Sequence, residues 1–239
     1  MNKNPTSIRR LTKLAIWLIV ISFIFNFSIN FYHIIDFPSL ICVSPVFLQN
    51  IGNALTIITS VILSVWIYRT NRNCHQEGVV GMRFSPFLSC LWSLIPLICF
   101  LFYFITSMLC PSIFALSKIF DLSWSVIYIS GFISAFFIIQ ELWKASKAPS
   151  NWKDEKNSSQ ITWWWCLGGI SLLLKQVYLL ATGIGDINHF ILFWTVFLIK
   201  CTCDLIFILL EIKIMISINK MQEKGLREFR DHNNLEAME

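Results

Sequence analysis

Six long apolar stretches occupy most of this 239-residue chain, and polar loops separate them. With 56% hydrophobic and only 14% charged residues, the chain is too apolar for a water-soluble domain. A hydrocarbon core about 30 Å thick is crossed by about 20 residues of apolar helix. The pattern predicts an all-α, polytopic transmembrane helix bundle. The predicted spans lie near residues 14–35, 46–68, 86–109, 122–143, 161–182 and 189–211.

Lysine and arginine are unevenly distributed among the loops. They gather before the first predicted span, between the second and third, after the fourth and after the sixth, whereas the opposite loops carry only Lys118. Because cytoplasmic loops carry the excess of these residues, the alternation predicts that both termini lie in the cytoplasm. The formal net charge of +5 follows from this asymmetry, and it indicates contact with anionic lipid headgroups, not with nucleic acid.

The chain is predicted to have two parts, a transmembrane helical domain at residues 1–217 and a polar tail at residues 218–239. The tail mixes acidic and basic side chains, so we expect a solvated helical extension in the cytoplasm. It is too short to bury a core of its own. The lipid bilayer is the partner that the sequence predicts. The sequence specifies no protein partner, and it leaves open whether the chain forms a homo-oligomer.

Three short stretches carry a resemblance to a known family. They are WIYRTNRN at residues 66–73, ELWKAS at residues 141–146 and WWW at residues 163–165. On these residues the chain resembles domain-of-unknown-function family 4328 of bacterial membrane proteins. The resemblance implies an integral protein of the bacterial cytoplasmic (inner) membrane and brings no established activity. The chain also carries the family's Ile-Pro element at residues 95–96, but here residues 97–140 separate it from the ELWKAS stretch, whereas the two elements lie close together in the family.

Polar residues of these stretches gather at the cytoplasmic ends of the predicted spans. Arg69, Asn71 and Asn73 follow the second span, and Glu141 lies near the end of the fourth. One interpretation is an aromatic belt with helix caps, in which Ser85 caps the third span. The other is a polar site that faces the cytoplasm and is built by Arg69, Asn71, Asn73 and Glu141, with an ion pair between Arg69 and Glu141.

Three ionisable residues fall within the predicted fifth and sixth spans. Lys200 and Asp204 are four residues apart, so they share a helix face and can pair. Lys175, in the fifth span, can reach Asp204 if the two helices are neighbours. Because charges inside a bilayer are unfavourable and often functional, the three residues favour an ion or proton path. A structural ion pair, with Lys175 extending toward the outer headgroups, explains them as well.

The first two predicted spans carry polar residues at helical spacing. These are Ser22, Asn26, Asn30 and His33 in the first span and Asn53, Thr56, Ser60 and Ser64 in the second. Antiparallel packing would bring Asn26 and Asn53 to about the same depth. We therefore expect hydrogen bonds between the two helices, with a solute pathway as the alternative.

The eight cysteines include no Cys-x-x-Cys motif. Cys201 and Cys203 are two apart on a helix and point to different sides, so we predict no metal site and no cofactor. Cys42 and Cys110 both fall at the outer ends of predicted spans, where the compartment can be oxidising. They are the candidate pair for a disulfide.

Signatures of catalysis are missing from the sequence. It has no Gly-rich phosphate loop with Lys, no His-Glu-x-x-His zinc motif and no nucleophile elbow. The sequence and the resemblance together favour a multi-pass structural or interaction protein of the bacterial cytoplasmic membrane over an enzyme. The alternative is a small-solute or ion transporter or channel that uses Lys175, Lys200 and Asp204.

Overall fold

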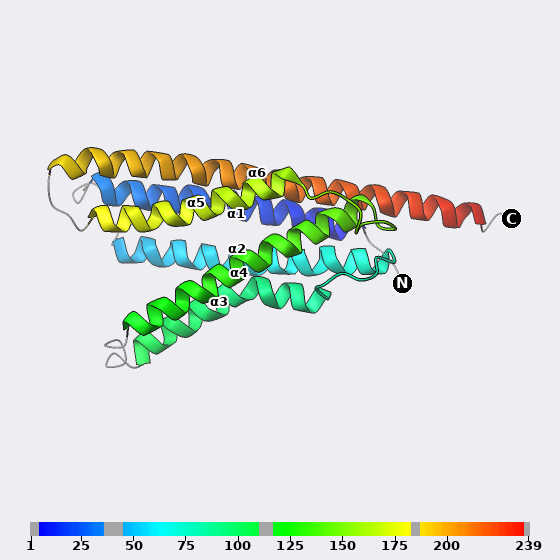
Figure 1. Ribbon diagram of the computed structural model, residues 1–239, viewed down its shortest axis with the longest axis horizontal. Helices are drawn as coiled ribbons and strands as arrows, with labels where there is room; N and C mark the ends of the chain where they lie inside the picture. The colour runs from blue at the N-terminus through cyan, green and yellow to red at the C-terminus, as the bar shows by residue number, and fades with distance from the viewer. Residues whose placement is uncertain (1–4, 36–44, 110–116, 183–186, 237–239) are drawn as a thin grey trace. The chain divides into compact units, whose positions relative to one another are not determined.

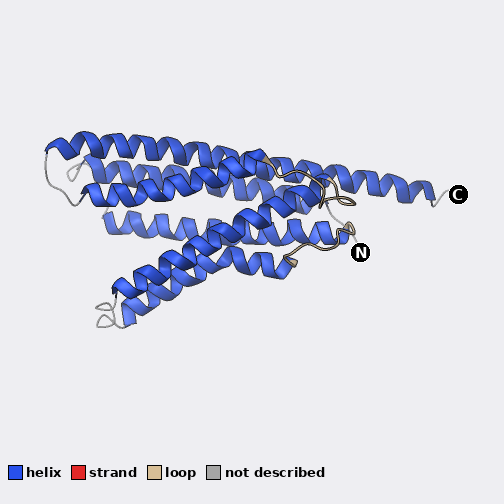
Figure 2. Cartoon of the chain, viewed as in Figure 1, coloured by secondary structure: helices blue, strands red, loops and turns tan. Residues whose placement is uncertain are grey.

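The computed structural model of this chain describes residues 5–35, 45–109, 117–182 and 187–236. Those residues form six α-helices and no β-strand, which confirms the all-α prediction for the described part of the chain (Figure 2). The helices are α1 (Pro5–Ile35), α2 (Pro45–Gln76), α3 (Pro86–Leu109), α4 (Ser117–Lys147), α5 (Ser159–Thr182) and α6 (Ile187–Glu236).

Local sequence explains how α2 ends and α3 begins. Pro86 takes the first helical position of α3, where its fixed φ suits the helix and its missing N–H has no partner to lose. Ser85 caps this helix as predicted, because its Oγ accepts a hydrogen bond from the Leu88 backbone N–H at 3.2 Å. Gly78 and Gly81 have φ of 85° and 81°, values that glycine adopts without strain, and they turn the chain between the two helices.

The chain forms two compact units, of which the first comprises residues 1–155 and 218–239 and the second residues 156–217. Within the first unit, α1 packs on α2, α2 packs on α3 and α4, and α3 packs on α4. Helices that follow one another in this unit run in opposite directions, as the colour progression from blue to green shows (Figure 1). The end of α6, from Ile218 onward, belongs to the same unit.

Helix α1 presents an apolar face outward. That face includes side chains that are between 45% and 66% exposed and recur every three or four residues: Leu14, Trp17, Ile21 and Ile24. The buried side of the same helix includes the polar residues Thr12 and Ser22. A surface helix of a water-soluble protein has the opposite arrangement, with its apolar stripe toward the core.

Two of the described helical segments are long and apolar enough to cross a bilayer, judged by length and composition. They are Ile8–Ile29, with 22 residues, and Phe47–Gln76, with 30 residues. Both exceed the roughly 20 residues that a hydrocarbon core requires. These two segments support the coarser prediction of a membrane-associated helical protein.

Helices α2 and α6 continue beyond the ends of the spans that the sequence predicts. The second predicted span ends at Tyr68 and the sixth at Glu211, but α2 ends at Gln76 and α6 at Glu236. With 50 residues, α6 is about 75 Å long, more than twice the thickness of a hydrocarbon core. Hydropathy marks where the membrane should end, whereas the backbone hydrogen bonds of a helix continue through polar residues.

Close contact between α1 and α2 depends on Gly52. A Cβ atom at this position would lie 3.1 Å from both Asn26 Oδ1 and Ile29 Cδ1. The two neighbouring side chains would have to shift to admit it. A small residue at a helix interface lets two backbones approach closely, and this is the function we assign to Gly52.

The second unit consists of α5 and the part of α6 that ends at Ser217. The Trp164 ring of α5 stacks on the Phe207 ring of α6, with centroids 5.3 Å apart and planes inclined by 19°. Such an aromatic pair contributes about 0.5–1.5 kcal/mol beyond the area it buries. The contact sets α5 beside α6 within this unit.

Candidate functional site

The predicted cluster of Arg69, Asn71 and Asn73 is divided between two sides of α2. Residues two apart on a helix point in nearly opposite directions, so Asn71 faces away from the other two. The Asn71 amide nitrogen donates hydrogen bonds to the Phe84 carbonyl oxygen at 3.0 Å and to Ser89 Oγ at 2.9 Å. Asn71 is 1% exposed and therefore fastens the start of α3 to α2.

Gln222 is the centre of a buried hydrogen-bond network. Its amide nitrogen donates to the Thr70 carbonyl oxygen at 3.0 Å and to Ser146 Oγ at 3.2 Å, and it lies 3.3 Å from Cys74 Sγ. Its Oε1 accepts a hydrogen bond from Asn73 Nδ2 at 3.4 Å. We call Gln222, Thr70, Asn73, Cys74 and Ser146 the Gln222 network. It joins the cytoplasmic ends predicted for α2 and α4 to the final part of α6.

The Gln222 network lies among buried residues of the first unit. Gln222 is 1% exposed, and the neighbouring Leu142, Ala145 and Ile218 are fully buried. A buried amide that lacks partners destabilises the fold by about 1–3 kcal/mol, whereas one whose partners are all present fixes the packing of the elements that supply them. The arrangement therefore suits a structural connection between three helices.

Sequence reasoning missed Gln222 because the tail was expected to be solvated. That expectation is wrong for the start of the tail, where Ile218, Asn219 and Gln222 are 0%, 9% and 1% exposed. A signal was present in the sequence. Ile214, Ile218 and Gln222 recur every four residues and form one buried stripe that continues past the predicted end of the sixth span.

A second buried network joins α1, α2 and the end of α6. Trp66 is 2% exposed, and its indole N–H donates to Thr12 Oγ1 at 3.0 Å. The Thr12 hydroxyl lies 2.9 Å from the Ile8 carbonyl oxygen and 3.4 Å from Asn219 Oδ1. The Asn219 amide nitrogen in turn donates to Glu223 Oε1 at 3.1 Å. Trp66, which opens the first family-like stretch, is thus a buried anchor between helices.

Glu141 pairs with Arg83, a partner that the sequence analysis did not predict. Glu141 Oε1 lies 3.5 Å from Arg83 Nε, and Oε2 accepts a hydrogen bond from the Arg83 backbone N–H at 3.1 Å. The Arg83 guanidinium also lies 5.8 Å from the centroid of the Phe137 ring. The turn after α2, which contains Gly78 and Gly81, places Arg83 beside α4. Sequence spacing alone does not predict such a contact.

Two of the three ionisable residues predicted within the membrane, Lys200 and Asp204, form an ion pair in the second unit. Lys200 Nζ lies 2.5 Å from Asp204 Oδ2, and the two side chains are 19% and 25% exposed. Ser171 of α5 donates a hydrogen bond to the other Asp204 oxygen. Lys175 lies on α5 four residues after Ser171, and its side chain is outside the described residues. Asp204 thus accepts from a cation on its own helix and from a hydroxyl on the other.

The polar residues of α1 and α2 mostly bond within their own helix. The Thr56, Ser60 and Ser64 hydroxyls each donate to the carbonyl oxygen four residues earlier. The Asn26 amide nitrogen does the same toward the Ser22 carbonyl oxygen. The expectation of hydrogen bonds between the two stripes is wrong for these four residues, because a short side chain can satisfy itself on the preceding turn. Ser64 does form a hydrogen bond between helices, but with α3, since its Oγ accepts from Ser93 Oγ at 2.9 Å. The side chains of Asn30 and His33 lie outside the described residues.

The predicted disulfide between Cys42 and Cys110 falls outside the described residues. The cysteines that the structure does describe are free thiols, namely Cys74, Cys90, Cys166, Cys201 and Cys203. In the same part of the chain, no three His, Cys, Asp or Glu side chains gather into a group that could hold a metal ion.

Two kinds of polar arrangement are therefore available for a function. One is a set of buried networks that join helices in the first unit, and the other is the carboxylate of Asp204 in the second. Comparison of the chain with protein-family models, with curated proteins and with solved structures found no match.

Proposed function

We propose that the chain is a multi-pass structural or interaction protein of the bacterial cytoplasmic membrane, related to domain-of-unknown-function family 4328. Its six helices would each cross the bilayer, and both termini would lie in the cytoplasm. The proposal includes no catalytic step. The bilayer is its partner, and a second copy of the chain or another membrane protein is the partner class to be sought.

The outward apolar face of α1 carries this proposal. Leu14, Trp17 and Ile24 are 48%, 66% and 57% exposed at helical spacing, while Thr12 on the same helix is 4% exposed. Such a face is unfavourable in water, because a contiguous exposed apolar surface favours aggregation. Hydrocarbon favours it. The same pattern recurs on α2, where Ile58, Val61 and Val65 are exposed.

The buried networks favour a structural function over transport in the first unit. Gln222, Asn71 and Trp66 each direct their polar atoms at another part of the chain. Polar groups used in this way hold helices together, which is the usual function of hydrogen bonds between membrane helices.

Cysteine labelling in membrane vesicles tests the topology. In a chain whose native cysteines have been replaced, Ser150→Cys in the exposed loop after α4 should react with an impermeant maleimide only in inverted vesicles. Asp186→Cys should react only in right-side-out vesicles. Labelling of Ser150→Cys from the outside would overturn the proposed orientation. Labelling of both positions from the same side would show that the chain does not cross the membrane once between them, as the proposed topology requires.

A transporter or channel is the second candidate, and the Asp204 arrangement favours it. Lys200 and Asp204 pair within a segment predicted to cross the membrane, and Ser171 adds a hydroxyl from another helix. Ionisable residues inside membranes often mark ion or proton paths. Lys175, on the Ser171 helix, would be the third member.

Flux through liposomes separates the two candidates. Purified chain reconstituted into liposomes with a proton or potassium gradient should show no more flux than empty liposomes if it is a structural protein. Flux that Asp204→Asn abolishes would establish the transporter instead. Asn at this position can still accept the Ser171 hydrogen bond, so retained thermal stability would separate loss of transport from loss of folding.

A further inference from the structure

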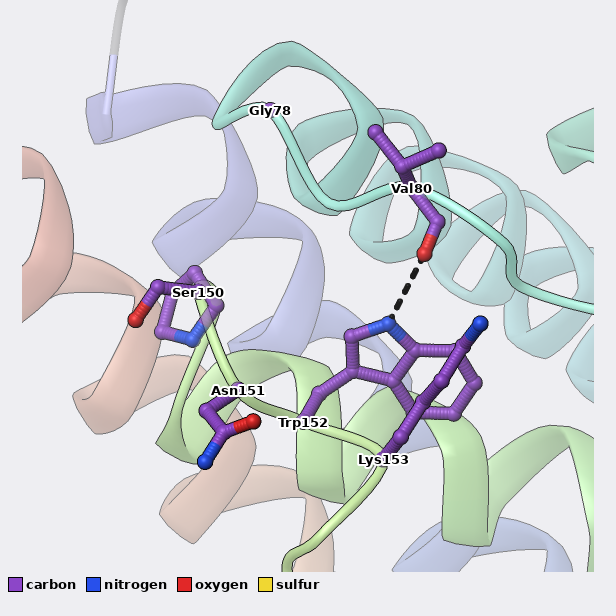
Figure 3. A pocket seen from close by; sticks show the side chains of 7 residues that line it. Gly78, Val80, Ser150, Asn151, Trp152 and Lys153 are labelled. Carbon is purple, nitrogen blue, oxygen red and sulfur yellow. Dashed lines mark hydrogen bonds between the residues drawn. The ribbon is translucent and has the colours of Figure 1, made fainter.

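Two loops of the first unit line an open pocket with a volume of about 280 Å³. Gly78 and Val80 line it from the loop after α2, and residues 149–153 line it from the loop after α4. The Trp152 indole N–H donates to the Val80 carbonyl oxygen at 3.0 Å and so connects the two walls (Figure 3). Ligand pockets commonly have volumes of about 300–1,000 Å³, so this one suits a small polar group and not a drug-sized molecule.

Lys153 supplies a positive charge to this pocket. Its side chain lies beside the Trp152 ring, with Nζ 6.0 Å from the ring centroid (Figure 3). A Cβ atom on Gly81 would lie 2.9 Å from the same Nζ, so the glycine leaves room for the ammonium group. Among the described ion pairs, none includes Lys153, whereas Lys147 in the same region is paired with Glu155 at 2.6 Å. The Lys153 charge is therefore available to an anion.

The mouth of the pocket combines this charge with apolar surface. Val80, which lines the pocket, is 80% exposed. A soluble anion gains nothing from such a residue. A lipid does, because the valine can enter the boundary between headgroups and acyl chains while an indole and a lysine remain at headgroup level.

We propose that this loop pocket binds the phosphate-bearing headgroup of an anionic phospholipid of the cytoplasmic leaflet, with Lys153 as its cation. The binding rests on the proposed topology, which puts both loops on the side where anionic lipids attract lysine and arginine. Trp152 holds the two walls together, and Val80 contacts the lipid interior. The pocket would thus fix one lipid molecule against the ends of α2 and α4.

Calorimetric titration of the full chain in an uncharged detergent tests this proposal. Dioctanoyl phosphatidylglycerol should bind measurably tighter than dioctanoyl phosphatidylcholine. Lys153→Gln should weaken phosphatidylglycerol binding about fivefold, the effect of one lysine near an anionic surface. Lys156→Gln removes the same charge three residues away and outside the pocket, so it should change the affinity less than about twofold.

A third variant tests the geometry of the pocket. Trp152→Phe keeps an aromatic ring but loses the hydrogen bond to Val80, so it should also weaken phosphatidylglycerol binding. Equal affinity for the two lipids, equal effects of the two lysine substitutions, or unchanged binding by Trp152→Phe would each overturn the proposal. Inorganic phosphate that binds as tightly as phosphatidylglycerol would assign the pocket to a soluble anion. Vesicle labelling tests the topology independently of this titration. The lipid-binding proposal can therefore fail while the proposed topology stands.

Discussion

The Gln222 amide nitrogen lies 3.0 Å from the Thr70 carbonyl oxygen, although 152 residues separate the two in the sequence. A carbonyl oxygen has two lone pairs, so it can accept this bond in addition to the bond of its own helix. The contact connects α2 to the end of α6 within the first unit. It makes a residue of the polar tail part of the interior.

Replacing Gln222 should destabilise the protein. Gln222→Leu keeps the side-chain volume roughly constant but leaves Ser146 and Asn73 without their amide partner, and we expect a loss of about 1–3 kcal/mol. Unfolding of the detergent-solubilised chain by added denaturant measures it. Lys220→Ala, at an exposed position of the same helix, is the control and should change stability by less than about 0.5 kcal/mol. If Gln222→Leu and Lys220→Ala unfold at similar denaturant concentrations, the Gln222 network contributes nothing to stability.

The same substitution, Trp→Phe, should destabilise the protein at a buried tryptophan and have little effect at an exposed one. Trp66 is 2% exposed and donates to Thr12, whereas Trp163 is 65% exposed. Trp66→Phe should therefore cost about 1–3 kcal/mol through the lost hydrogen bond and the space left behind. Trp163→Phe should be nearly neutral. Thermal unfolding of both variants in one detergent is the measurement, and a larger loss for Trp163→Phe would contradict the packing of α1 on α2.

Glu141 should be coupled to Arg83 more strongly than to Arg69. The Arg83 side chain is 72% exposed, so solvent screens the pair and its coupling energy should be about 0–1 kcal/mol. Glu141→Ala should nevertheless be the more harmful single change, because it also removes the acceptor of the Arg83 backbone N–H. Double-mutant cycles with Arg83→Ala and with Arg69→Ala measure both couplings. A larger coupling to Arg69 would restore the pairing expected from the sequence.

Removing one partner of the Lys200–Asp204 pair should be worse than removing both. Asp204→Leu leaves Lys200 without its counter-charge, and we expect a loss of up to about 3 kcal/mol. Adding Lys200→Met should recover much of it, because two apolar side chains suit a bilayer. Reconstituted protein unfolded by heat gives the comparison, with exposed Thr202→Val as the control. A double variant less stable than the single one would show that the charges contribute separately.

The sequence predicted those features that depend on local chemistry. The start of α3 was predicted at Pro86 and observed there, since a serine cap followed by proline is a local signal. The Lys200–Asp204 pair is local too, because four-residue spacing places both side chains on one helix face. Helical class and apolar segments follow from composition.

Features that depend on distant parts of the chain were not predicted. Arg83 reaches Glu141 only because two left-handed glycines redirect the loop, and its charge alone does not distinguish it from Arg69. Asn26 was expected to bond across helices, but its own backbone offered a nearer acceptor. Gln222 was assigned to a solvated tail, since its burial depends on the ends of α2 and α4 coming together.

The order of protein synthesis gives the Gln222 network a further consequence. Ser146 precedes Gln222 by 76 residues, which a ribosome adds in about 4–15 s at roughly 5–20 residues per second. Throughout that interval the Ser146 hydroxyl and the Cys74 thiol have no Gln222 amide to contact, and water can reach them. The network therefore closes late, and the speed at which α5 and α6 are translated sets how long this end of the first unit stays open.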